Sequence, residues 1–213
     1  FPPHRRFLQF QWKGQTFEFA SLLFGLSSAT WCFTMVLRPA IEFLQTRGIR
    51  LIVYLDNILL MDQSQERLLD HLRMAVSLLQ DLRFIINKKK SCLIPFLWII
   101  FLGFEIDSKV VTLSLPSRKI ARIKQVLRAT LSKSHTSLRQ IAQMVGPLSS
   151  SIQAIFLGPL HYRALQRLKA YNLRRGLRYS ERISLSEELK EEMCWWLAYM
   201  ESWNGRAIFD SNP

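Results

Sequence analysis

The sequence has few cysteines and no internal repeat, it does not begin with Met, and we expect it to contain no signal peptide. Its three cysteines, Cys32, Cys92 and Cys194, are widely separated and lack metal-ligand spacing, which argues against a disulfide framework or a zinc module. We expect buried thiols in a reducing compartment, and therefore an intracellular protein of the cytoplasm or nucleus. From the two ends we expect a segment cut from a longer polyprotein.

Long uncharged runs are also scarce. The run 19–37 is long enough to cross a membrane, but Ser21, Ser27, Ser28 and Gly25 dilute its apolar character. The run 93–104 is too short to span and contains Pro95. We expect no membrane partner, and attachment to a membrane surface is the weakest alternative.

Acidic residues are almost missing from one stretch. Between Pro116 and Arg182 there are fourteen Lys or Arg and a single acid, Glu181, which accounts for the whole net charge of +13. Elsewhere the two signs balance. A basic block of this size favours contact with phosphates. A solvated basic helix face without a partner is the alternative.

Apolar residues make up 49% of the 213 residues, enough for a real core in one large or two small domains. Aromatic alternation predicts a hairpin over 7–19 around Lys13-Gly14, and a helix follows over 28–45 that Pro39 should kink or divide. Further along the first half, periodicity predicts one helix, 64–83, and short strands at 51–55, 58–61, 84–86, 101–106 and 110–113.

After Pro116 the pattern becomes helical. Apolar spacing predicts helices over 120–131, 137–155, 160–173 and 187–200. The spacing of Ser137 and Gln140 is typical of a capping box at a helix start. The order of elements therefore predicts an α+β fold, with an antiparallel sheet and helices followed by a mostly helical part.

Asp56 lies inside the apolar run "LIVYLDNILLM" (51–61), where a carboxylate is costly to bury. A tight turn at Asp56-Asn57 would project the carboxylate out of the sheet as a metal ligand. Two-metal polymerases hold two Mg²⁺ ions between acids on adjacent strands. The alternative is a surface turn in which Asp56 and Asn57 cap their own backbone.

Four segments stand in the order and spacing of a reverse transcriptase palm: "FGLSSATWCFTMVL" (24–37), "YLDNILL" (54–60), "INKKKS" (86–91) and "FLGFEID" (101–107). The chain resembles the reverse transcriptases of retrotransposons, most closely those of the tyrosine-recombinase type known as DIRS-like elements. The resemblance implies partial fingers and palm over 1–113, a basic helical thumb over 114–180, and a connector over 181–213 leading toward a ribonuclease H domain expected downstream in the parent polyprotein.

The resemblance also implies site residues in the palm. Phe24, Gly25, Leu26 and Ser27 match the loop beneath the nascent base pair and template, and Tyr54 precedes the catalytic hairpin. Lys88 or Lys89 matches the basic residue near the incoming triphosphate, a candidate for protonating the pyrophosphate leaving group. The pattern does not choose between these lysines.

Further along the chain, Leu102, Gly103 and Phe104 match the primer grip, the hairpin that holds the primer 3′ end. The thumb is expected to track the duplex through backbone contacts, where the basic excess was found independently. The expected backbone-binding residues are Arg118, Lys119, Arg122, Lys124, Arg139, Arg163, Arg167, Lys169, Arg174, Arg175 and Arg178.

Asn57 departs from the family pattern, because it stands where the second acid of the hairpin is expected. The first catalytic aspartate of the family lies on a strand upstream of the aromatic hairpin, and the sequence begins after that point. Asp56 is thus the expected metal ligand, and Asn57 the site of a lost or weakened one. An intact parent would use two Mg²⁺ ions, an RNA template, a DNA primer and dNTPs.

From these residues we predict a fragment of an RNA-directed DNA polymerase that binds Mg²⁺ weakly or not at all and is inactive alone. The alternative is a relic, or a co-opted module, that binds nucleic acid without chemistry.

Overall fold

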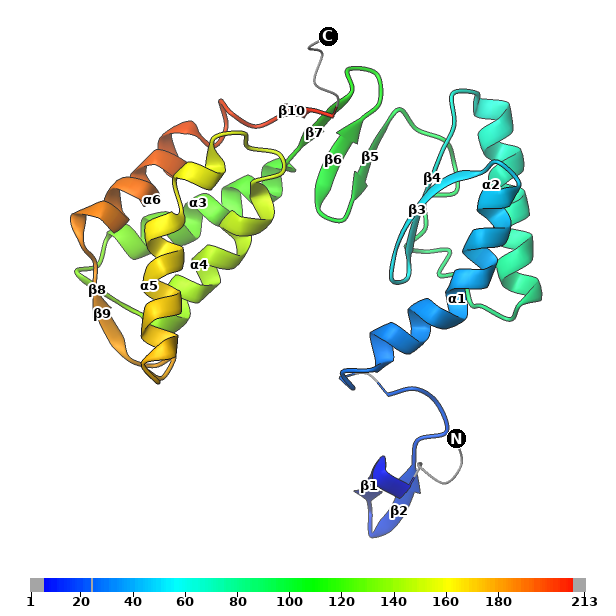
Figure 1. Ribbon diagram of the computed structural model, residues 1–213, viewed down its shortest axis with the longest axis horizontal. Helices are drawn as coiled ribbons and strands as arrows, with labels where there is room; N and C mark the ends of the chain where they lie inside the picture. Colours follow the sequence, from blue (N-terminus) through cyan, green and yellow to red (C-terminus); the bar gives the residue numbers. More distant parts are fainter. Residues whose placement is uncertain (1–5, 24, 209–213) are drawn as a thin grey trace. The chain divides into compact units, whose positions relative to one another are not determined.

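The computed structural model describes residues 6–23 and 25–208, and the chain divides into two compact units, Phe1–Pro95 and Phe96–Pro213 (Figure 1). The division falls inside the segment predicted as palm. The assignment of palm, thumb and connector by function stays a prediction.

The first unit opens with the predicted aromatic hairpin. Strands β1 (Gln9–Trp12) and β2 (Gln15–Glu18) pair antiparallel around Lys13 and Gly14, which both have positive φ, as a two-residue type I′ turn requires. The rings of Phe10 and Phe17 stack with centroids 5.6 Å apart, and both remain exposed. The hairpin thus has one aromatic face that it does not bury.

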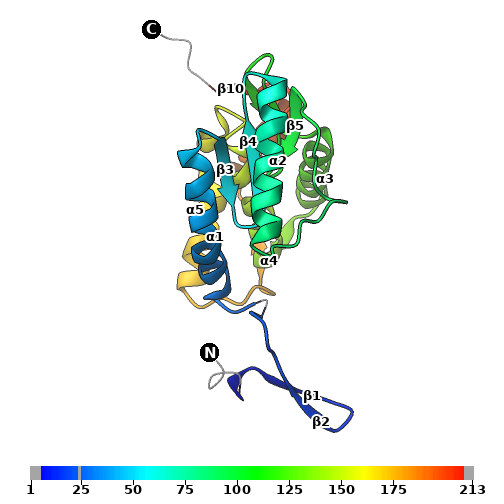
Figure 2. The same cartoon turned by 90° about the vertical axis from the view of Figure 1, so that its right-hand side faces the viewer.

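Helices α1 (Ala29–Thr46) and α2 (Gln65–Asp81) lie beside a second hairpin, β3 (Arg50–Tyr54) and β4 (Asn57–Met61) (Figures 1 and 2). Pro39 does not divide α1, contrary to one of the two expectations for it. The inward row of the hairpin is apolar and packs against buried Leu44 and Ala75. Residues 84–86 are not a strand, so that prediction is wrong.

In the second unit a four-stranded antiparallel sheet has the order β10-β7-β6-β5. Its strands are β5 (Trp98–Phe101), β6 (Phe104–Asp107), β7 (Thr112–Ser114) and β10 (Arg206–Ala207). The strand predicted over 101–106 is therefore two strands joined by a turn at Leu102-Gly103. A further antiparallel pair of strands, β8 (His135–Ser137) and β9 (Arg182–Ser184), was not predicted.

The helices of the second unit follow the prediction. They are α3 (Ser117–Leu131), α4 (Leu138–Ser151), α5 (Arg163–Arg174) and α6 (Glu187–Tyr199), with the short 3₁₀ helix η2 (Gly158–Leu160) before α5. The capping box is confirmed: the backbone N–H of Gln140 donates to Ser137 Oγ, and the N–H of Ser137 donates to Gln140 Oε1, both at 3.2 Å.

One apolar core runs through the second unit from Leu115 to Met200, with the indole of Trp196 fully buried in it. The predicted thumb and connector therefore share a single core. The cysteine prediction is wrong for two of the three thiols, because Cys92 and Cys194 are exposed and Cys32 is half-buried. Within 6–23 and 25–208, no helix combines the length and apolar character that crossing a membrane requires.

Candidate functional site

Asp56 lies in the two-residue turn between β3 and β4. Tyr54 pairs with Asn57, so the turn consists of Leu55 and Asp56, one residue earlier than predicted. Leu55 has a φ of 54°, a region that costs a non-glycine residue roughly 1–3 kcal/mol. This backbone places the Asp56 carboxylate at the exposed end of the hairpin.

Asn57 is the first residue of β4, and its Nδ2 donates to Asp56 Oδ1 at 3.3 Å. The alternative prediction was that both side chains cap the backbone of the turn. Among the described residues, neither side chain forms a hydrogen bond with the turn backbone. The Asn57 amide instead donates to one oxygen of the Asp56 carboxylate, which is the only carboxylate on the turn. One carboxylate with an amide neighbour does not fit a site for two Mg²⁺ ions, which prefer several anionic oxygens.

The predicted nucleotide loop precedes α1. Phe24 lies outside the described residues. Gly25 has a φ of 93°, and a Cβ there would meet no atom within 4 Å, so the backbone is open to close approach. Leu26 is half-buried and Ser27 is exposed, while Tyr54 on β3 is 57% exposed. These positions are accessible, but their contact with a nucleotide stays a prediction.

Lys88 and Lys89 lie in an exposed turn, 88–90, after α2. Asn87 orders this turn, since its side-chain oxygen accepts from the Lys90 N–H at 3.3 Å. Both lysines are exposed, so the geometry does not choose between them.

In the second unit, the predicted primer grip is the β5–β6 turn. Leu102 and Gly103 have φ values of 51° and 79°, again the pattern of a type I′ turn, and Leu102 is exposed. Phe104 begins β6, and the Lys119 ammonium of α3 lies 4.7 Å from its ring centroid. Partial burial lowers the pKa of Lys119 below its ordinary value.

The predicted backbone-binding residues differ in burial and in whether they form an ion pair within the chain. Lys124 is buried and its Nζ lies 2.9 Å from Glu201 Oε1, which points to a structural ion pair. Arg167 pairs with Glu188 at 2.8 Å on the surface. Lys169 is half-buried. The exposed members that form no ion pair with another described residue are Arg118, Arg122, Arg139, Arg163, Arg174, Arg175 and Arg178.

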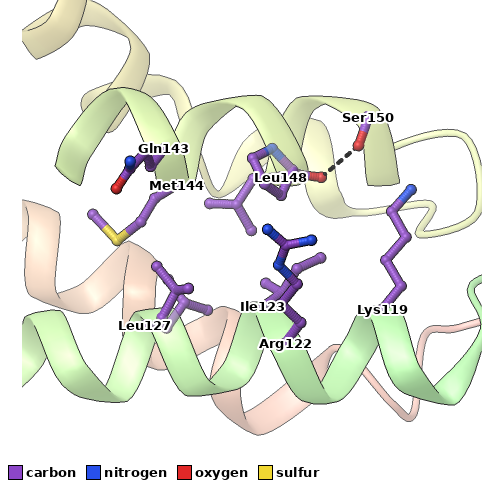
Figure 3. Close-up of a pocket in the computed structure, with 10 residues that line it drawn as sticks. Lys119, Arg122, Ile123, Leu127, Gln143, Met144, Leu148 and Ser150 are labelled. Carbon is purple, nitrogen blue, oxygen red and sulfur yellow. Dashed lines mark hydrogen bonds between the residues drawn. The ribbon is translucent and has the colours of Figure 1, made fainter. Parts of the chain in front are cut away.

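A groove of about 540 Å³ lies between α3 and α4 (Figure 3). Lys119 and Arg122 rise into it from α3, and Gln143 and Ser150 face them from α4. Ile123, Met144 and Leu148 form part of its apolar lining. The α4 residues had no distinguishing signal in the sequence, because their role depends on which face of α4 packs beside α3.

Comparison with known protein families identifies the first half of the chain. Residues 1–106, which include the Asp56 turn and most of the β5–β6 hairpin, match the family described as reverse transcriptase (RNA-dependent DNA polymerase). The chain carries a reverse transcriptase domain. No curated protein sequence matches the chain.

Solved structures share the fold of this reverse transcriptase domain. A foamy viral protease–reverse transcriptase dRH bound to double-stranded DNA matches with a TM-score of 0.70 and 18% identity, over 96% of this chain and 32% of that one. The foamy viral protease–reverse transcriptase with double-stranded DNA gives 0.70 and 19%, over 96% and 39%. The foamy viral protease–reverse transcriptase in complex with an RNA/DNA hybrid gives 0.69 and 18%, over 92% and 24%.

At these identities the likeness concerns the fold, and it confirms the predicted α+β reverse transcriptase fold. The chain spans between about a quarter and two-fifths of the solved chains that it matches.

Proposed function

We propose that this reverse transcriptase domain is part of an RNA-directed DNA polymerase encoded by a retrotransposon of the DIRS-like type. The observation that carries the proposal is the family match over residues 1–106, which contains Asp56 at an exposed hairpin turn. The foamy viral relatives in complex with DNA and with an RNA/DNA hybrid support a nucleic-acid substrate.

In this proposal the substrates are an RNA template, a DNA primer and dNTPs. Gly25, Ser27 and Tyr54 border the nucleotide, and Lys88 or Lys89 approaches its triphosphate. The β5–β6 turn holds the primer end, and the exposed arginines of the second unit bind phosphates without regard to sequence. The parent acts inside the cell and continues into a ribonuclease H domain.

The two Mg²⁺ ions belong to the intact parent in this proposal. Among the described residues of the β3–β4 hairpin, Asp56 is the only acid, and Asn57 donates a hydrogen bond to it. This arrangement does not fit a site for two Mg²⁺ ions. We therefore expect this chain to bind primer–template but not to extend the primer.

Primer extension tests the proposal directly. The 213-residue chain and its D56A, N57D and D56A/N57D variants are each incubated with a labelled RNA–DNA primer–template, dNTPs and Mg²⁺. We expect no extension from any of them. A chain that continues into the sequence encoded ahead of Phe1 is expected to gain extension with N57D and to lose it with D56A. If the unmodified 213 residues extend the primer and D56A abolishes this extension, the prediction that the chain is inactive is wrong. If the longer chain is equally active with and without N57D, Asn57 is a tolerated variant.

A second candidate function is a nucleic-acid-binding module without chemistry. The pairing of Asn57 with Asp56 and the exposed arginines of the second unit favour it. For this module, affinity for a duplex falls steeply with salt. Replacing Arg174, Arg175 and Arg178 with Gln weakens binding, whereas D56A leaves it unchanged. Binding that is absent or independent of salt argues against both candidate functions.

A further inference from the structure

The four-stranded sheet of the second unit has two edges that differ in chemistry. At one edge, β10 has only two residues and one of them, Arg206, is charged, while the preceding Gly205 donates its N–H to the Ala154 carbonyl at 3.1 Å. At the other edge, β5 is longer, and the segment 91–101 that contains it has no charged residue (Figure 1). Charge and short length are common means of keeping an edge from pairing with another chain. β10 has both, and β5 lacks the first.

The register of β5 determines which of its backbone groups point away from the sheet. Phe101 precedes the two-residue turn to β6 and exchanges hydrogen bonds across it, so every second residue of β5 faces β6. In agreement, the Ser108 N–H donates to the Leu97 carbonyl at 2.8 Å. The backbone N–H and C=O groups of Trp98 and Ile100 therefore point outward, and in the described part of the chain they bind no other group.

The side chains along this edge are apolar and exposed. Trp98 and Ile100 lie on one face of β5 and are 49% and 52% exposed, and Phe96, Leu97 and Val110, at the same end of the hairpin, are between 62% and 68% exposed. At roughly 150–250 Å² for a whole large side chain, these five leave about 450–750 Å² of surface in water. Two such surfaces together reach the lower part of the range for stable protein interfaces, about 1,200–2,000 Å² in total.

We propose that two copies of this chain pair through β5, antiparallel and around a two-fold axis at Ile99, so that their four-stranded sheets join into one. In this register Trp98 of one copy lies opposite Ile100 of the other, and the same pair recurs on the far side of the axis. Each pair exchanges two backbone hydrogen bonds, because these are the residues whose backbone groups point outward. The edge of β5 is thus complementary to itself.

A second copy fits this edge by charge and by shape. Each chain carries a net charge of +13, but none of it lies in 91–101, so two copies meet there without like charges in contact. An aromatic residue opposite a β-branched one, as Trp98 is opposite Ile100, is a favourable cross-strand pair. Because the β10 edge is protected, the association closes at two copies and does not continue into a fibre. The partner assigned here goes beyond the proposed function and does not rest on it.

Sedimentation velocity of the full 213-residue chain, without nucleic acid and over a series of concentrations, measures the association. We expect the mass to rise from 25.0 kDa toward twice that value. Ile100→Lys places a charge on the exposed face of the edge and should keep the chain monomeric. Ile85→Lys is the matched control, because Ile85 is 98% exposed and lies in no strand, and it should associate as wild type does. Circular dichroism checks that each variant is folded.

A disulfide tests the register. Ile99 would meet its counterpart at the axis in a non-hydrogen-bonded pair, with Cα atoms about 4.5 Å apart, which a disulfide can bridge. With Cys32, Cys92 and Cys194 replaced by Ser, Ile99→Cys should cross-link two chains under mild oxidation. Ile106 pairs with Ile99 on β6 and is the control. In Ile106→Cys the two strands that carry the thiols would be about 14 Å apart, so no cross-link is expected.

Three results would overturn the inference. A wild-type chain that stays at 25.0 kDa at every concentration does not use this edge for association. A dimer that Ile100→Lys leaves intact, or that Ile99→Cys does not cross-link, forms through another surface. Particles that grow beyond two copies would show that the edge does not close on itself. The proposed function is tested separately, by primer extension, and stands or falls independently of these results.

Discussion

The two units of the chain bury their apolar residues to very different degrees. In the second unit one cluster extends from Leu115 to Met200 and encloses Trp196 completely. The buried residues of the first unit form two small clusters among those described, around Leu44 and around Leu37. Because folding depends on such burial, we expect the second unit to be the more stable of the two, while the first leaves much of its apolar surface uncovered.

That uncovered surface is aromatic and organised. The β1–β2 hairpin exposes Phe10 and Phe17 on one face, and an isolated two-stranded hairpin is at most marginally stable in water. On α1, Trp31, Met35 and Phe43 are exposed at intervals of four and eight residues, which places them on one side of the helix. The contrast with the second unit teaches that aromatic content alone does not indicate a core.

The largest expected effect comes from truncating the buried indole. Trp196→Ala removes a fully buried side chain whose Nε1 also donates to the His161 carbonyl at 2.7 Å. We expect the free energy of unfolding of the second unit to fall by about 3–5 kcal/mol. Trp31→Ala, at a side chain that is 65% exposed, should change stability by less than about 0.5 kcal/mol.

Guanidinium unfolding followed by far-ultraviolet circular dichroism measures both variants. Similar losses for Trp196→Ala and Trp31→Ala would mean that the exposed face of α1 is covered in solution, and the contrast between the units would fail.

A smaller effect is expected at a glycine beside the same indole. A Cβ on Gly158 would lie 2.8 Å from an indole carbon of Trp196, a clash that the buried ring cannot easily relieve. Gly158→Ala should therefore destabilise the second unit by about 1–3 kcal/mol. Gly146→Ala is the matched control, because its Cβ would meet nothing within 4 Å on α4.

Since alanine favours a helix over glycine, Gly146→Ala should stabilise by up to about 1 kcal/mol. Thermal melting of the two variants beside wild type is sufficient. Equal shifts in the same direction would show that Trp196 is not packed against η2 as described.

The smallest expected effect concerns the first unit and pH. The backbone N–H of Ser64 donates to Asp62 Oδ1 at 2.9 Å, and Arg67 also bonds to it, so the pKa of Asp62 lies below its ordinary value of 3.8. A carboxyl with a depressed folded pKa stabilises the fold above its unfolded pKa, and this contribution disappears as pH falls through the folded value.

The first unit should therefore lose stability below about pH 4, and Asp62→Asn should flatten that part of the profile. Denaturant midpoints at a series of pH values between neutral and strongly acidic measure it. The control Asp70→Asn changes an exposed carboxylate on α2, paired on the surface with Arg73, and should leave the profile unaltered. A profile as steep in Asp62→Asn as in wild type would contradict the assignment.

Sequence periodicity was sufficient to predict the helices. Apolar spacing predicted α2, α3, α4, α5 and α6, and the residue pair Ser137 and Gln140 identified the start of α4. Short strands were harder to predict, because β8, β9 and β10 have two or three residues, which is too few for an alternating pattern to be recognised. Their pairing depends on contacts distant in sequence.

For the candidate site, the order of the motifs predicted where site residues lie, whereas residue type alone did not predict which basic side chains are available to a ligand. The motifs placed Asp56 on a hairpin turn and Leu102-Gly103 in a hairpin, as the structure has them, although periodicity predicted one continuous strand over 101–106. Lys124 was grouped with the phosphate-binding residues, although its spacing from Ile120, Ile123 and Leu127 put it beside the core face of α3. Its partner, Glu201, lies far along the chain, so only the fold reveals the pair.

The turn that carries Asp56 also bears on the history of Asn57. The positive φ falls on Leu55, and Asn57 already belongs to β4, so the hairpin makes no conformational demand for an amide there. Asparagine and aspartate codons differ by a single base. Since neither residue is needed to form the turn, one transition could convert either into the other without disturbing the fold, and copies of such a gene could pass between the two forms while their architecture is inherited unchanged.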